Sequence, residues 1–146
     1  MGKQHLLSLH LPKFYKEKEM ADRKVVLEKI VVHNNGDRMG KGELYWAISA
    51  NSQEISLRDR KNPHKTKDGE TIFLGDHLTV SNLTDSDTLK IDGWVSEKDG
   101  VLSGSDEKAD FSHIYSRRDN WGMGSYDVRL QDHPLDVTLS YRIEDL

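Results

Sequence analysis

The segment Glu43-Leu44-Tyr45-Trp46-Ala47-Ile48-Ser49-Ala50 decides the fold class. Every second residue from Leu44 to Ile48 is large and apolar, and the residues between them differ in kind. Side chains along a β-strand point alternately to its two faces, so this pattern is typical of a strand with one face in a protein core. We therefore predict a half-buried strand over residues 43–50.

Similar short segments follow along most of the chain. Strand-like stretches are expected at 24–33, 53–57, 71–74, 77–81, 88–96, 111–115, 126–131 and 137–143. Turn-forming residues such as Gly75-Asp76 separate them, and no amphipathic helical pattern of about ten or more residues occurs after residue 23. The sequence thus predicts an all-β fold, a single antiparallel β-sandwich of about eight strands over residues 24–146.

The first 23 residues have a different composition. Leu7, Leu9 and Leu11 alternate with polar residues, and the stretch from Lys13 to Glu19 is highly charged. Two interpretations stay open. One is a mobile tail, since chain termini are loose unless tied down. The other is an extended N-terminal arm that docks on a neighbouring copy and supports a homo-oligomer.

Composition excludes several classes of function. The chain has 146 residues, no cysteine, and a net charge of −4 with acids and bases mixed along it. Disulfides, thiolate metal sites and cysteine nucleophiles are excluded, and a general nucleic-acid binder is not expected. No stretch has the length of a signal-peptide core or a membrane span. We expect a cytoplasmic protein, with leaderless export or association with a particle left open.

Two acidic segments are the candidate functional site. In the first, residues 33–43, Asp37 and Glu43 lie six positions apart; in the second, residues 97–110, Glu97 and Asp99 lie two apart and Asp106 follows seven later. Ca²⁺ takes about 6–8 oxygen ligands, more than either segment supplies alone. Brought together at one end of a sandwich, both could. The predicted metal ligands are Asp37, Glu43, Glu97, Asp99 and Asp106, with Asn35 and Ser105 as additional candidates.

These spacings resemble those of the C2-type calcium-binding β-sandwich, of the synaptotagmin and protein kinase C kind. That family has two acids about six apart in one loop, and an acid-x-acid pair followed by a further acid in another. The segment 36–46 is also similar to a D-x-x-G-x-G-E motif that opens bacterial β-domains, and residues 121–126 to their closing region. The resemblance implies Ca²⁺ as the cofactor. Glu43 and Glu97 stand where the family has aspartates.

The same resemblance implies a lipid-contacting or partner-contacting surface at the loop tips. Met39, Val101 and Leu102 fall at the expected tips, and such apolar residues enter a bilayer in the family. A basic run offers a second contact surface for an anionic membrane or an acidic protein face. Its residues are Arg58, Arg60, Lys61, Lys65 and Lys67. The alternative for this run is a solvated loop.

We interpret the chain as a calcium-dependent binding or assembly module that contacts anionic lipid or a protein partner. It is not expected to be an enzyme, because the histidines lack metal-site spacing and no nucleophile motif occurs. One alternative is that the acidic residues only form turns. Another is a structural subunit of a phage, secretion or shell assembly in which metal is incidental. A third is a carbohydrate-binding module that uses Trp94 or Trp121 as a stacking platform.

Overall fold

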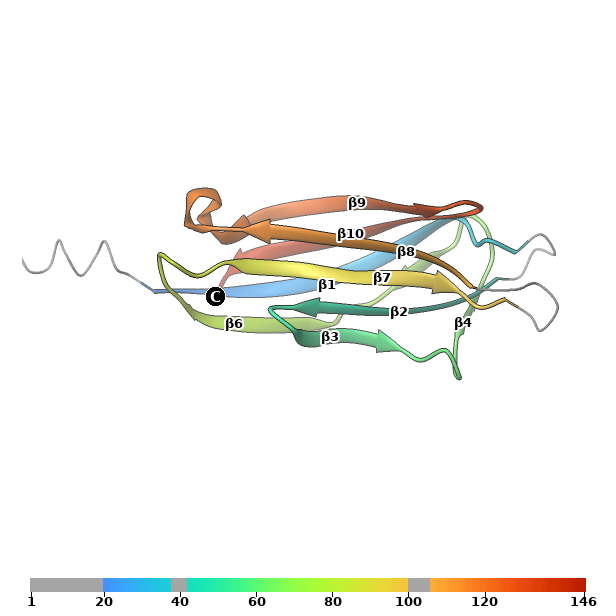
Figure 1. The fold of residues 1–146 in the computed structure, drawn as a ribbon, viewed down its shortest axis with the longest axis horizontal. Coiled ribbons are helices and arrows are strands. Elements are labelled where there is room, and N and C mark those ends of the chain that lie inside the picture. The colour runs from blue at the N-terminus through green and yellow to red at the C-terminus, as the bar shows by residue number, and fades with distance from the viewer. Residues whose placement is uncertain (1–19, 38–41, 100–105) are drawn as a thin grey trace, which may run out of the picture.

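The computed structural model describes residues 20–37, 42–99 and 106–146 (Figure 1). Residues 1–19, most of the predicted arm, lie outside the described residues. So do the predicted tip residues Met39, Val101 and Leu102, and the candidate ligand Ser105. No helix within the described ranges is long and apolar enough to cross a membrane.

The described residues form ten strands and one short 3₁₀ segment. In chain order they are β1 (Ala21–Asn34), β2 (Gly42–Ala50), β3 (Gln53–Arg58), β4 (His64–Thr66), β5 (Thr71–Phe73), β6 (His77–Leu83), β7 (Leu89–Glu97), β8 (Glu107–Tyr115), η1 (Arg117–Gly122), β9 (Gly124–Asp132) and β10 (Leu135–Asp145). The predicted all-β class is confirmed. Two differences matter below: β4 lies within the basic run, and β8 begins four residues before the expected start at Phe111.

The strands build two antiparallel sheets that face each other (Figure 1). One sheet has the order β5-β1-β10-β9, with β6 also paired to β1. The other has the order β3-β2-β7-β8, with β4 also paired to β2. This arrangement confirms the predicted antiparallel sandwich, and it places the last residues of β7 beside the first residues of both β2 and β8.

The core lies between the two sheets and follows the alternation seen in the sequence. Along β2 the side chains at every second position, including Leu44, Trp46 and Ile48, are buried. Across the core, Tyr141 of β10 is fully buried. The indole N–H of Trp46 donates to Ser56 Oγ at 3.0 Å, so the one polar group that this ring brings into the core is satisfied.

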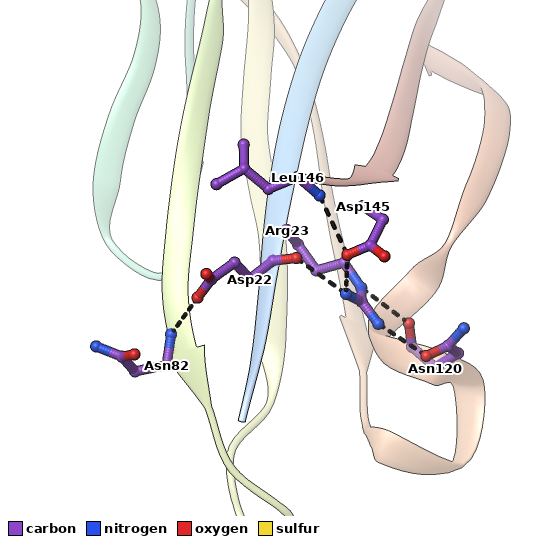
Figure 2. Close-up of polar contacts among 6 residues, drawn as sticks. All are labelled: Asp22, Arg23, Asn82, Asn120, Asp145 and Leu146. Carbon is purple, nitrogen blue, oxygen red and sulfur yellow. Dashed lines mark hydrogen bonds and ion pairs between the residues drawn. The ribbon is translucent and has the colours of Figure 1, made fainter. Parts of the chain in front are cut away.

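A buried arginine ties one end of the sandwich together. Arg23 of β1 is only 5% exposed, and Figure 2 shows its guanidinium between Asn120 of η1 and Asp145 of β10. Figure 1 places η1 and the C-terminus at one end of the molecule, and the last residues of β1 and β7 at the other. Asp37 and Asp99 follow the ends of β1 and β7 by three and two residues, so they lie toward the end away from Arg23.

Candidate metal centre

Strand pairing brings acidic residues together at the end of the second sheet. Glu97, the last residue of β7, pairs with Leu44 of β2 on one side and with Glu107, the first residue of β8, on the other. Leu44, Glu97 and Val95 are all buried, so Glu97 lies on the core-facing side of its sheet. Asp99 follows two positions later, where the strand period returns a side chain to that same side.

Three carboxylates converge at this point. Glu97, Asp99 and Glu107 each offer an oxygen, and these oxygens lie within 4.8 Å of one another. Glu97 is only 3% exposed. Within the described part of the chain, neither Glu97 Oε2 nor Glu107 Oε2 has a hydrogen-bond partner. Buried polar atoms are nearly always paired, so two unpaired carboxylate oxygens in one cluster are an unusual feature.

The electrostatics of the cluster follow from this crowding. Burial raises the pKa of Glu97 to about 9, and the neighbouring Asp99 carboxylate contributes next, followed by the charges of Glu107 and Asp37. The pKa of Glu107 is also raised, first by burial and then by Asp99. Burial disfavours a charged carboxylate, and like charges disfavour it further. Without a cation, the Glu97 carboxyl therefore retains its proton at neutral pH.

The first acidic segment approaches the cluster at Gly36, the residue before Asp37. The charge of Asp37 makes the smallest of the contributions to the raised pKa of Glu97. Gly36 has φ +85°, and a Cβ there would lie 3.1 Å from the Glu97 side chain. Glycine is thus required both by its left-handed backbone and by the close approach to Glu97.

Asn35 has a structural role in the same segment. It is fully buried, its amide nitrogen donates to Thr66 O at 3.0 Å, and its Oδ1 accepts from the Asp37 backbone N–H at 2.8 Å. Its own backbone N–H donates to Asp68 Oδ1 at 2.8 Å. The predicted extra ligand Asn35 therefore shapes the turn that carries Asp37.

Glu43 lies on the other face of its sheet. Leu44 is fully buried and directly opposite Glu97, and the alternation along β2 turns the preceding residue outward. Among the described residues, Glu43 is not part of the carboxylate cluster. Its backbone oxygen nevertheless accepts from the Lys98 N–H at 2.8 Å, which holds the exit of β7 against the start of β2.

Asp106 also lies outside the cluster. Its Oδ2 accepts from the Tyr45 hydroxyl and from Arg60 Nε at 2.7 Å. Its Oδ1 accepts from Arg60 Nη2 at 3.3 Å and from the Asp99 backbone N–H at 2.9 Å. The Arg60 guanidinium is the main cause that lowers the pKa of Asp106 to about 2.

Glu107 is the cluster member that the sequence analysis did not select. It alternates with Ala109 and Phe111, which face or pack against the core, and this period-two pattern could have identified it as an inward-facing acid. The prediction that β8 starts at Phe111 left Glu107 in a loop, where no direction can be assigned to a side chain.

The basic run is partly structural. Arg58 Nε donates to Asn62 O at 2.6 Å and its Nη2 to Pro63 O at 3.3 Å, which stabilises the turn before β4. Arg60 binds Asp106. The side-chain ammonium groups of Lys61, Lys65 and Lys67 form no hydrogen bond or ion pair with the described residues, whereas the backbone oxygen of Lys67 accepts from Thr66 Oγ1 at 3.4 Å.

Neither tryptophan of the carbohydrate alternative presents an open ring. Trp121 is 6% exposed, lies beside the Arg23 guanidinium and donates to Asp87 O at 3.2 Å. The Trp94 ring has Lys108 Nζ over it at 4.7 Å from its centroid and Tyr45 packed against it edge-on. Stacking a sugar on that face of Trp94 would require Lys108 to move.

Comparison with solved structures finds similar β-sandwiches. A C2 domain of plant extended synaptotagmin 1 matches at a TM-score of 0.44 and 12% identity, over 87% of this chain and 96% of that one. A structure described as a C2 domain matches at 0.47 and 10%, over 85% and 98%. A C2 domain protein from Ramazzottius varieornatus matches at 0.45 and 9%, over 87% and 91%.

The chain is thus similar to C2 domain structures, as the spacing of its acids predicted. At this identity the similarity assigns neither a ligand nor a functional residue. No protein-family model and no curated protein matches the sequence.

Proposed function

We propose that the protein is a calcium-binding β-sandwich module. One observation carries the proposal: the converging carboxylates of Glu97, Asp99 and Glu107 include two oxygens for which the described residues supply no donor. A cation would satisfy those oxygens and compensate the charges that otherwise repel one another. The cost of an unpaired buried acceptor makes such an arrangement difficult to explain as turn chemistry alone.

The chemistry of the ligands favours Ca²⁺ over other metals. All the groups in the cluster are carboxylates, and no histidine belongs to it. Hard oxygen ligands suit Ca²⁺ and Mg²⁺, whereas Zn²⁺ and Cu²⁺ prefer nitrogen or sulfur. Ca²⁺ also accepts irregular and bidentate carboxylate coordination, while Mg²⁺ demands near-ideal octahedral geometry. Asp37, which follows the glycine that lies against the Glu97 side chain, is the proposed fourth acid.

Bound Ca²⁺ would supply positive charge at an end that is otherwise acidic. Glu97, Asp99 and Glu107 would hold it between β7 and β8, and Asp37 would join the first acidic segment to them. The neutralised end could then bind an anionic lipid or an acidic protein face. Positive charge is added by Lys61 of the β3–β4 connection, Lys65 of β4 and Lys67 directly after β4. The proposed role is therefore ion-dependent binding or assembly.

Calorimetric titration with Ca²⁺ at pH 7.5 tests the metal site. We expect the wild-type protein to bind and Asp99→Asn to bind more than about tenfold more weakly, because affinity depends on the number of charged ligands. Asp59→Asn is the matched control, since it removes the same charge from the β3–β4 connection without touching the cluster. Absence of heat with wild-type protein at millimolar Ca²⁺ would contradict the proposal.

Two further measurements separate the lipid and protein partners. Co-sedimentation with vesicles of phosphatidylcholine and phosphatidylserine, in Ca²⁺ and in chelator, tests the lipid surface; pure phosphatidylcholine vesicles are the control. Native mass in the same two conditions tests self-assembly. Calcium-dependent sedimentation supports the lipid role, and a calcium-dependent oligomer supports assembly. An oligomer unaffected by chelator would favour a structural subunit.

A further inference from the structure

The contacts of Asp106 distinguish it from the carboxylates next to it. Glu107 lies in the cluster, whereas Asp106 accepts hydrogen bonds from the Tyr45 hydroxyl, from two nitrogens of Arg60 and from the Asp99 backbone. A carboxylate offers about four lone-pair sites, so these donors use the whole acceptor capacity of Asp106. The group cannot also ligate a cation without giving up one of these donors.

The bond from the Asp99 N–H links this arrangement to the metal centre. The Asp99 carboxylate lies close to both Glu97 and Glu107, since the three groups offer oxygens within 4.8 Å of one another. Asp106 fixes the backbone of that residue, and Asp106 is itself fixed by the two-point contact of Arg60 and by Tyr45. The contact joins the β3–β4 connection and β2 to the segment that carries Asp99.

We propose that Asp106 and Arg60 are positioning residues of the calcium site, holding Asp99 in place for Ca²⁺ without touching the ion. This inference rests on the proposed function and names the residues that set its affinity. The positive charge of Arg60 is compensated by Asp106 at 2.7 Å, and the same carboxylate accepts from the Tyr45 hydroxyl.

The proposal predicts that replacing Arg60 changes Ca²⁺ affinity in the direction opposite to the one expected from its charge alone. Removal of a positive charge near a cation site strengthens cation binding, but for a half-exposed side chain the effect is at most about fivefold. Loss of an outer partner that orients a metal ligand weakens metal binding by about 10–100-fold. The second effect is the larger, so Arg60→Gln is expected to weaken Ca²⁺ binding.

Calcium calorimetry on a small set of variants tests the proposal. Arg60→Gln and Tyr45→Phe should each weaken binding, Arg60→Gln by about tenfold. The double variant Arg60→Gln, Asp106→Asn should bind no more weakly than Asp106→Asn alone. Arg60 acts on Asp99 only through Asp106, so its loss has no further effect once Asp106 is replaced. Arg60→Lys should recover part of the loss. Lys61→Gln, the matched control for charge, should bind as well as the wild-type protein or slightly better.

Each result decides between positioning and ligation. If Asp106 is a ligand restrained by Arg60, Arg60→Gln will tighten binding, and that gain will disappear in the double variant; this result overturns the proposal. An Arg60→Gln affinity equal to that of Lys61→Gln also overturns it. Circular dichroism melting in chelator confirms that each variant is folded during titration. If the wild-type protein does not bind Ca²⁺, the proposed function fails and the positioning role falls with it.

Discussion

Each end of the sandwich buries an ionisable side chain, and the two ends differ in whether the polar atoms of that side chain have hydrogen-bond partners. At one end, Arg23 donates to Asp22 O, Asp145 Oδ1 and both oxygens of Asn120. Its guanidinium also lies over the Trp121 ring at 5.4 Å from the centroid. At the other end, Glu97 is similarly buried, yet one of its oxygens has no donor among the described residues.

This difference separates a charge whose hydrogen bonds are complete from one that has an unpaired oxygen. A buried ion that is fully hydrogen-bonded needs nothing further, and it stabilises the elements that supply its partners. A buried acid with an unpaired acceptor costs free energy in the isolated protein, and a bound cation, as we propose at Glu97, would remove that cost. The backbone agrees with this interpretation at the Arg23 end. Asn120 and Trp121 have φ +52° and +48°, a conformation that the contacts to Arg23 and Asp87 hold in place.

The largest expected effect on stability is at the end of the sandwich that contains Arg23. Arg23→Ala removes all of these hydrogen bonds together with the packing of the guanidinium on Trp121, so we expect a loss of about 3 kcal/mol in the free energy of unfolding. Chemical denaturation in chelator measures it. Lys24→Ala, one residue along the same strand, should cost less than about 0.5 kcal/mol. An equal loss of stability in the two variants would mean that Arg23 does not hold β1, η1 and β10 together.

The second effect is stabilisation of the acidic end by its ligand. Because Ca²⁺ is expected to bind only the folded chain, it should stabilise the protein by about 2.7 kcal/mol at 100 times the dissociation constant. Thermal melting with Ca²⁺ and with chelator measures this, and Arg23→Ala should show the same increment from its lower baseline, since its site is at the other end. A melting temperature that does not change in millimolar Ca²⁺ would contradict the proposal that the acidic end binds this ion.

Much of this comparison could be predicted from the sequence, and the reason lies in the strand period. The alternation through Leu44, Trp46 and Ile48 predicts the core face, and the two-residue spacing of Glu97 and Asp99 predicts that both acids share a side. The same alternation already places Glu43 on the outer face, next to buried Leu44. The alternation within a strand is therefore sufficient to predict on which face of the sheet each side chain lies.

Other features depend on contacts that no local pattern encodes. The Arg60 contact with Asp106 joins residues 46 positions apart, and the Arg23 contact with Asn120 joins residues 97 positions apart. Spacing alone predicts Asp106 as a ligand, and nothing near it in the sequence reveals its contact with Arg60. Glu107 lies before the strand predicted over 111–115, because strand boundaries are the least predictable property of an element.

A third prediction concerns the unpaired acceptor itself. Glu97→Gln supplies an amide that can donate to the Asp99 carboxylate, so the variant should be more stable than the wild-type protein by about 1–2 kcal/mol in chelator at pH 8. Burial raises the pKa of Glu97 from 4.5 to about 9, so the folded wild-type chain binds more protons than the unfolded chain between these values. Wild-type stability should therefore fall as pH rises through that range.

Urea denaturation at pH 5 and pH 8 measures this prediction. The difference between Glu97→Gln and wild type should be large at pH 8 and small at pH 5, where the unfolded wild-type chain also retains part of its proton. The variant should also lose Ca²⁺ binding, because the amide is a weaker ligand and carries no charge. A difference that does not change with pH would mean that Glu97 is already paired in the folded protein.

The smallest effect is predicted for Asp145, the only carboxylate that contacts Arg23 among the described residues. Its side chain is 74% exposed, and an ion pair in contact with water contributes little, so Asp145→Asn should lower the free energy of unfolding by no more than about 0.5 kcal/mol. Arg23 would keep the neutral oxygens of Asp22 and Asn120. Chemical denaturation of Asp145→Asn beside Asn120→Ala checks this, and we expect Asn120→Ala to be the more destabilising. If Asp145→Asn is the more destabilising, the ion pair contributes more to the stability of the buried arginine than its hydrogen bonds to neutral oxygens.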